Sequence, residues 1–153
     1  MEMKAVDQAL LDAVVEILEE DAWNYSVFLK SVLIENYKNR DSVETMRKVF
    51  GEDVVAHDIH VIRKGEVWPI ISTSLYYAGD EGAGPAAQSL SSRKFQSLIS
   101  KLRGQVENIL RATIKVESFW FREGHPAYPV FWDFAFVFTG ETSVTILVGS
   151  SSD

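Results

Sequence analysis

The chain of 153 residues contains no cysteine. This absence excludes disulfide scaffolds, zinc sites with thiolate ligands, redox motifs and cysteine nucleophiles, and it favours a reducing compartment. Histidine and proline are also scarce, with 3 and 4 residues. The longest uncharged run, residues 67–79, is too short to cross a bilayer and contains a proline. The N-terminus lacks the basic region and apolar run of a signal peptide. We therefore expect a soluble, cytoplasmic protein without a membrane segment.

The N-terminal part of the chain also has few basic residues. The formal net charge is -7, and residues 1–24 contribute -6 of it, whereas residues 25–111 contribute +2 and residues 112–153 contribute -3. Such a chain repels phosphate groups at long range, which argues against nucleic acid as a partner and favours a basic protein. A solvated helix face without a partner is the simpler explanation of the same charges.

The strongest local signal lies in residues 130–148, which are dense in aromatic and β-branched side chains. This composition predicts a strand pair, with Gly140 and Glu141 as a two-residue type II′ turn. Both faces of the first strand are apolar: the even-numbered residues from Val130 to Phe138 share one face, and Phe131, Ala135 and Val137 share the other with Asp133. Such a strand is either enclosed between two layers or lines a pocket or an interface.

Hydrophobic periodicity predicts the remaining elements. Helices are expected at residues 5–21, 26–39, 42–50 and 92–111, and strands at residues 54–63, 67–77 and 113–121. Asp41 and Glu44 have capping-box spacing at the third helix. Residues 78–91 read as a flexible loop and residues 149–153 as a tail. The whole is one α+β domain: N-terminal helices and one long central helix packed on a curved, mainly antiparallel sheet that ends in a three-stranded meander.

The order divides the domain into a helical part (1–51), a strand pair (52–77), a loop (78–91), a helix (92–111), a meander (113–148) and a tail (149–153). In the first helix, the acids Asp12, Glu16, Glu19 and Glu20 lie opposite the apolar stripe. Like charges four residues apart disfavour the helix slightly. This acidic face is the candidate docking surface for a cationic partner.

Candidate catalytic residues are few. Asp133 stands in an otherwise apolar strand, where burial would raise its pKa, although it could equally be a charge that discourages aggregation. Asp58 and His60 share a strand face and could form an acid-base pair, whereas His57 faces the other way. His125 lies in a distant loop. We predict no metal site and no cofactor, because too few ligands converge.

Gly82 to Ala87 match the dinucleotide pattern G-x-G-x-x-A. Asp80 and Glu81 would repel a pyrophosphate, and Pro85 removes an amide donor. The chain also lacks the alternating β-α units that such a site requires. We interpret this stretch as a loop.

Two resemblances bear on function. The order of elements is similar to that of the nuclear-transport-factor-2-like family, which implies a curved sheet around a pocket, with Asp58, His60, Trp120 and Asp133 as pocket residues. The second resemblance is to bacterial immunity proteins of polymorphic-toxin and contact-dependent inhibition systems. It is carried by the small, acidic, cysteine-free chain, by Phe131-Trp132-Asp133-Phe134 and by the C-terminal Gly149 to Asp153.

The second resemblance implies a non-enzymatic inhibitor of a basic toxin. On that hypothesis Asp12, Glu16, Glu19 and Glu20 steer the approach, and an exposed aromatic residue, Trp23, Trp68 or Trp120, anchors the complex. The alternative is a pocket protein that binds a small molecule or acts as a lyase or isomerase. A homodimer that uses the sheet face as its interface is the third interpretation.

Overall fold

The computed structural model describes residues 2–35, 42–51, 55–123, 127 and 129–153. The elements are α1 (Gln8–Glu19), β1 (Ser26–Ile34), α2 (Ser42–Phe50), β2 (Val55–Ile62), a short 3-10 turn η1 (Lys64–Glu66), α3 (Val67–Leu75), α4 (Ala87–Ser91), α5 (Arg93–Ala112), β3 (Lys115–Glu123), β4 (Trp132–Thr139) and β5 (Val144–Ser152).

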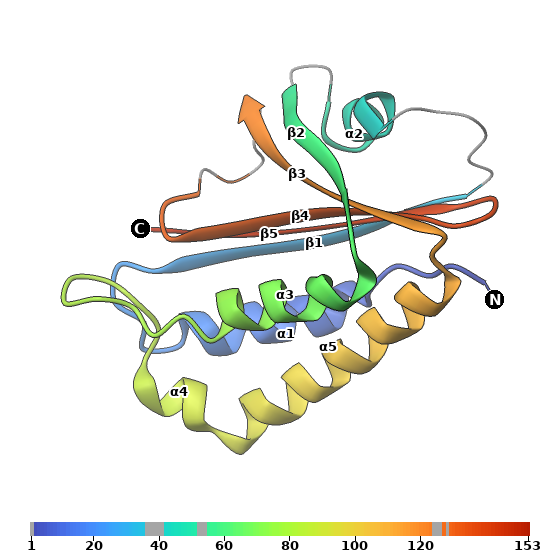
Figure 1. The fold of residues 1–153 in the computed structure, drawn as a ribbon. Coiled ribbons are helices and arrows are strands. Elements are labelled where there is room, and N and C mark those ends of the chain that lie inside the picture. The colour runs from blue at the N-terminus through green and yellow to red at the C-terminus, as the bar shows by residue number, and fades with distance from the viewer. Residues whose placement is uncertain (1, 36–41, 52–54, 124–126, 128) are drawn as a thin grey trace.

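The five strands form an open antiparallel sheet in the order β1-β5-β4-β3-β2. Helices α1, α3 and α5 lie against one face of it, whereas β2, the far part of β3 and α2 rise on the other side (Figure 1). The expected α+β class and the C-terminal meander β3-β4-β5 are thus confirmed.

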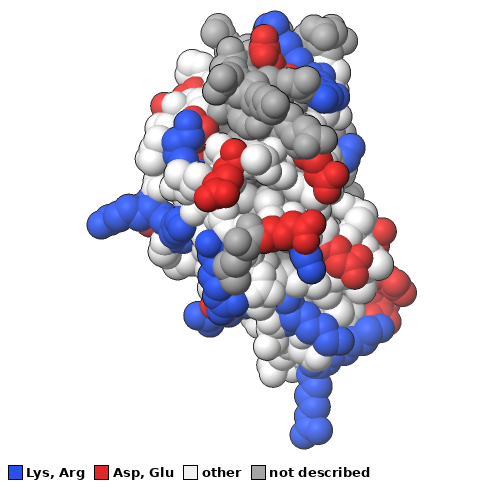
Figure 2. All heavy atoms as spheres, turned by 90° about the vertical axis from the view of Figure 1, so that its right-hand side faces the viewer, with Lys and Arg blue, Asp and Glu red and all other residues white. Residues whose placement is uncertain are grey.

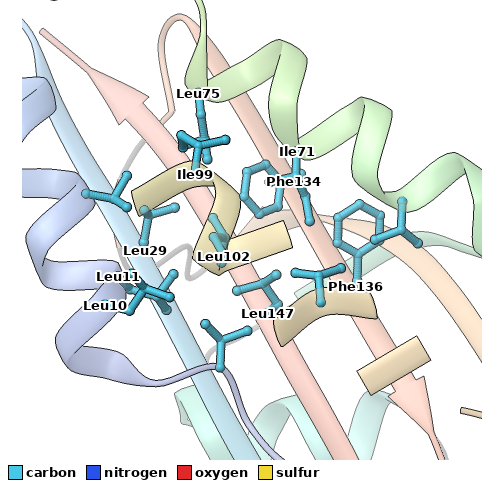
Figure 3. Close-up of a cluster of buried hydrophobic side chains, with 14 of the residues drawn as sticks. Leu10, Leu11, Leu29, Ile71, Leu75, Ile99, Leu102, Phe134, Phe136 and Leu147 are labelled. Atoms are coloured by element: carbon cyan, nitrogen blue, oxygen red, sulfur yellow. The ribbon is translucent and has the colours of Figure 1, made fainter. Parts of the chain in front are cut away.

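The sheet separates two apolar clusters. On the helical side, α1, α3 and α5 direct leucine and isoleucine side chains onto Phe134, Phe136 and Leu147 (Figure 3). On the other side, Ala135 and Val137 pack with Phe119 and Phe121 of β3. The two-faced apolar pattern of β4 therefore reflects enclosure between two layers.

Residues 26–39, expected as a helix, begin instead with strand β1. Val27 and Leu29 face the helical layer, whereas Phe28 packs against the second cluster. Because both faces of β1 are covered, its apolar residues do not alternate with polar ones, and the run imitates a helical stripe. Residues 36–39 lie outside the described part of the chain, as does Asp41 of the expected capping box.

The expected strand at residues 67–77 is also wrong, because this segment forms helix α3. Pro69 occupies the third helical position, where a missing N–H costs nothing since the first turn has no intrahelical acceptor. Val67, Ile71 and Leu75 recur every four residues and are fully buried. The proline marks the start of a helix and not the edge of a strand.

Two details of the C-terminal hairpin differ from expectation. Thr139 pairs with Val144, so the loop has four residues, closed by a 2.8 Å hydrogen bond from the Gly140 N–H to the Ser143 carbonyl. The expected tail is part of β5: Ser150 and Ser151 are 1% exposed and pair with β4 and β1. Small side chains fit there because aromatic rings fill the neighbouring space.

Candidate protein-interaction surface

The main chain of Trp23 is held by two hydrogen bonds to Gly84. Its N–H donates to the Gly84 carbonyl at 3.0 Å, and its carbonyl accepts from the Gly84 N–H at 2.8 Å. Asp21 and Asn24 take left-handed φ angles of 54° and 45°, which turn the chain between α1 and β1. The Trp23 side chain nevertheless is 69% exposed. The protein thus holds a large apolar ring in solvent on an ordered backbone.

The segment that pairs with Trp23 is held by hydrogen bonds, and part of the loop expected at residues 78–91 is a helix. Asp80 accepts hydrogen bonds through one carboxylate oxygen from the N–H groups of Gly82 and Ala83, at 2.9 and 3.0 Å. Gly79 and Gly84 approach so closely that a Cβ on Gly84 would lie 2.6 Å from the Gly79 Cα. Residues 87–91 of the same stretch form α4.

Acidic residues are found in both chain segments that meet at the Trp23 bridge, the main-chain pairing of Trp23 with Gly84. Glu20 and Asp21 precede Trp23 at the end of α1, and Asp80 and Glu81 lie in the loop that Gly84 ties to it; all four are exposed. We call Glu20, Asp21, Trp23, Asp80 and Glu81 the Trp23 surface. Lys94 borders it, since it lines a hollow of about 230 Å³ together with Glu20 and Asp21.

The opposite end of the molecule has a different charge pattern. Figure 2 shows Lys, Arg, Asp and Glu side chains interspersed on the face away from the connection of α1 to β1. On this face, therefore, neither sign of charge predominates.

The four acids expected to steer a partner are exposed on or next to α1, but they are not equivalent. Asp12 accepts a hydrogen bond from the Gln8 side chain at 2.9 Å. Glu19 accepts one from the main-chain N–H of Val27, also at 2.9 Å. Within the described residues Glu16 and Glu20 form neither a side-chain hydrogen bond nor an ion pair. Glu16 and Glu20 are thus available to a partner, whereas Glu19 supports β1.

The other two candidate anchors differ in exposure. Trp120 on β3 is 44% exposed, and its ring meets that of His57 edge-on, with 4.6 Å between the ring centroids. Trp68 is half-buried against the helical core, with the Arg103 guanidinium 5.9 Å from its ring centroid. Trp23 and Trp120 present their rings to solvent, and Trp68 packs inside the fold.

Tyr25, two residues after Trp23, belongs to an aromatic cluster with Tyr77, Phe131 and Trp132. The rings of Tyr25, Tyr77 and Phe131 lie with centroids 5.7 to 6.2 Å apart. The Trp132 indole N–H donates to the Tyr25 hydroxyl at 2.8 Å. Burial raises the pKa of Tyr25, so its hydroxyl stays neutral and can accept this bond. The cluster therefore ties Tyr25, just before β1, to Tyr77 and to the start of β4.

Asp133 is the first residue of β4 on the face that also carries Ala135 and Val137, and it pairs with Ser150 of β5. Burial among its apolar neighbours raises its pKa, even though part of the side chain is exposed. Among the described residues it makes no ion pair. β3 pairs with β4 only from Lys115 to Ser118, opposite the second half of β4. At Asp133, in the first half of β4, no described residue of β3 is paired with this strand.

Asp58 and His60 form an exposed pair on β2. Asp58 takes a φ of 54° at an irregular point of the strand, and the His60 Nδ1 lies 2.7 Å from the Asp58 carbonyl and 3.9 Å from its carboxylate. His125 of the histidine set lies outside the described residues. Within the described part of the chain, no group of three or more acidic or histidine side chains could hold a metal ion.

Two shallow hollows lie beside α5, one against the segment before α1 and the other against the start of α1. One of about 550 Å³ is lined by Lys4, Asp7 and Asn108, and the other, of about 560 Å³, by Leu10, Leu98 and Lys101. Neither includes Asp58, His60 or Asp133. The pocket interpretation of those residues stays a prediction.

The sequence alone identified Trp23 and Glu20 but not Asp80 or Glu81 as their neighbours. The contact between the two segments is made by main-chain atoms of Trp23 and Gly84, which leave no side-chain signature. The glycine-rich stretch 79–84 was the available signal, because close backbone approach requires glycine.

No helix among the described residues is long and apolar enough to cross a membrane. Comparison with protein-family models, with curated proteins and with solved structures finds no match for the chain.

Proposed function

We propose that this protein is a non-enzymatic binding protein that inhibits a basic protein partner through the Trp23 surface. The observation that carries the proposal is the 69% exposed Trp23, which two main-chain hydrogen bonds hold between two segments that carry the exposed acids Glu20, Asp21, Asp80 and Glu81. Tryptophan is enriched among the residues that dominate binding energy at protein interfaces. An ordered backbone lowers the entropy lost when such a residue is buried by a partner.

The charges around Trp23 favour a cationic partner. Four exposed acids, Glu20, Asp21, Asp80 and Glu81, belong to the two segments that the Trp23 bridge joins. An indole face itself attracts guanidinium and ammonium groups. The four carboxylates would accelerate the approach of a basic protein and fix its orientation. A toxin domain that must bind nucleic acid has this basic character, which supports an immunity-type role in the cytoplasm.

The acids on or next to α1 have two different roles: some attract the partner, and others stabilise the fold. Glu16 and Glu20, which have no hydrogen-bond partner among the described residues, take part in steering. Glu19 and Asp12 already bind Val27 and Gln8 and so act on the fold. Trp120, exposed on β3, is the second candidate contact.

The test is a pull-down from extract of the native host, with the purified chain as bait. We expect a basic protein that is retained at low salt, released at high salt and inhibited in its own toxic or nuclease activity when bound. Retention of the chain itself alone, or of proteins that are indifferent to salt, would contradict the proposal.

A further inference from the structure

β1 and β2 are the outer strands of the sheet, and among the described residues each has a side without a neighbouring strand. Such an edge displays main-chain groups that can pair with another chain. The β2 edge is irregular, because its register with β3 shifts twice and Asp58 has a positive φ. An irregular edge is a poor template for strand addition. β1, by contrast, pairs with β5 without a register shift from Ser26 to Ile34.

Side chains of α1 occupy the outer side of β1. The Glu19 carboxylate accepts from the Val27 N–H at 2.9 Å, and the Gln8 side-chain amide donates to the Leu29 carbonyl at 2.9 Å. The same amide accepts from the Ser31 N–H at 3.2 Å. Because alternate residues of an antiparallel strand direct their main-chain groups to the same side, Val27, Leu29 and Ser31 form one outward row.

The Gln8 side-chain amide replaces a peptide group of a neighbouring strand. Its N–H donates to the Leu29 carbonyl, and its oxygen accepts from the Ser31 N–H. Its orientation is fixed by Asp12, whose carboxylate accepts a second hydrogen bond from the Gln8 amide at 2.9 Å. The Ser31 hydroxyl in turn accepts from the Val6 N–H at 2.9 Å, which ties the segment before α1 to the same position.

We propose that Gln8 and Glu19 close the outer edge of β1 against a second copy of this chain. The regularity of β1 makes its edge self-complementary, since two copies related by a twofold axis could pair β1 with β1 in antiparallel fashion. Each side-chain hydrogen bond to Val27, Leu29 or Ser31 uses a group that this pairing would require. Gln8 and Glu19 therefore keep the sheet from extending through this edge.

The test compares the double variant Gln8→Ala/Glu19→Ala with Glu16→Gln, which lies on the same helix without contacting β1. Sedimentation velocity over a range of concentrations measures association. We expect the double variant to dimerise with rising concentration and the control to remain unchanged. Glu19→Gln, which keeps an acceptor for the Val27 N–H, should stay monomeric.

Hydrogen exchange provides a second readout at concentrations too low for association. Loss of the side-chain acceptors should accelerate exchange of the Val27 and Ser31 amides by about tenfold, as for one lost hydrogen bond. A double variant that stays monomeric would overturn the proposal, whether or not its Val27 and Ser31 amides exchange faster, and so would equal dimerisation of Glu16→Gln. If the double variant does not fold, the single variant Gln8→Ala is tested in the same way.

Discussion

Trp23 and Gly84 form an isolated antiparallel bridge that joins the end of α1 to the loop before α4, with hydrogen bonds of 3.0 and 2.8 Å. The bridge has room only for glycine at position 84, where φ is 150° and an added Cβ would lie 2.6 Å from the Gly79 Cα. It determines where the exposed indole stands.

The substitution Gly84→Ala should therefore lower the free energy of unfolding by about 1–3 kcal/mol and weaken partner binding, because the bridge must shift. Urea unfolding measures the first effect. Gly104→Ala is the control, since a Cβ on this exposed helical glycine meets no atom within 4 Å and should stabilise the protein by about 0.5–1 kcal/mol. A Gly84→Ala protein as stable as the native one would show that the bridge is dispensable.

Gly149 lies within β5 under the Phe134 ring. A Cβ there would approach the ring to 2.4 Å and the Leu29 side chain to 2.8 Å. We expect Gly149→Ala to destabilise the fold by about 1–3 kcal/mol through overpacking, measured by the urea midpoint. If Gly149 belonged to a loose tail, the substitution would have no effect.

Residues 130–148 could be predicted as strands because aromatic and β-branched residues are dense there, and α5 could be predicted because its 20 residues show a clear helical period. β1 and α3 have nine residues each and mix apolar residues with Ser, Thr or Lys, so their sequence pattern alone does not decide between helix and strand. The serines of β5 resembled a tail in sequence, because their burial comes from pairing with β4 and with β1, which lies far away along the chain.

Asp133 should make stability depend on pH. Its pKa is raised in the folded state above the ordinary 3.8, so between these two values the folded protein binds more protons than the unfolded chain. Stability therefore falls as the pH rises through this interval. We expect Asp133→Asn to be at least as stable as the native protein at pH 7, with the difference shrinking toward pH 4. Urea unfolding across this range provides the measurement, and a variant less stable than the native protein at pH 7 would show that the carboxylate is needed.

The acids of α1 should separate into two classes. Charge reversal at Glu16 and Glu20 should slow association with the partner and reduce the dependence of its rate on salt, without lowering the urea midpoint. Glu19→Ala should instead lower stability by about 0.5–1.5 kcal/mol, because the Val27 N–H loses its acceptor. If charge reversal at Glu16 and Glu20 leaves the association rate unchanged, these residues do not take part in the interface.

The central claim is that Trp23 anchors a basic partner, and the most direct measurement is a parallel capture from native-host extract with the native chain, Trp23→Ala and Trp120→Ala as baits. Because the Trp23 side chain is exposed, its removal should leave the urea midpoint unchanged. The account predicts that a basic, salt-sensitive protein bound by the native chain is lost with Trp23→Ala. Equal recovery of that protein by the native chain and by Trp23→Ala would contradict it.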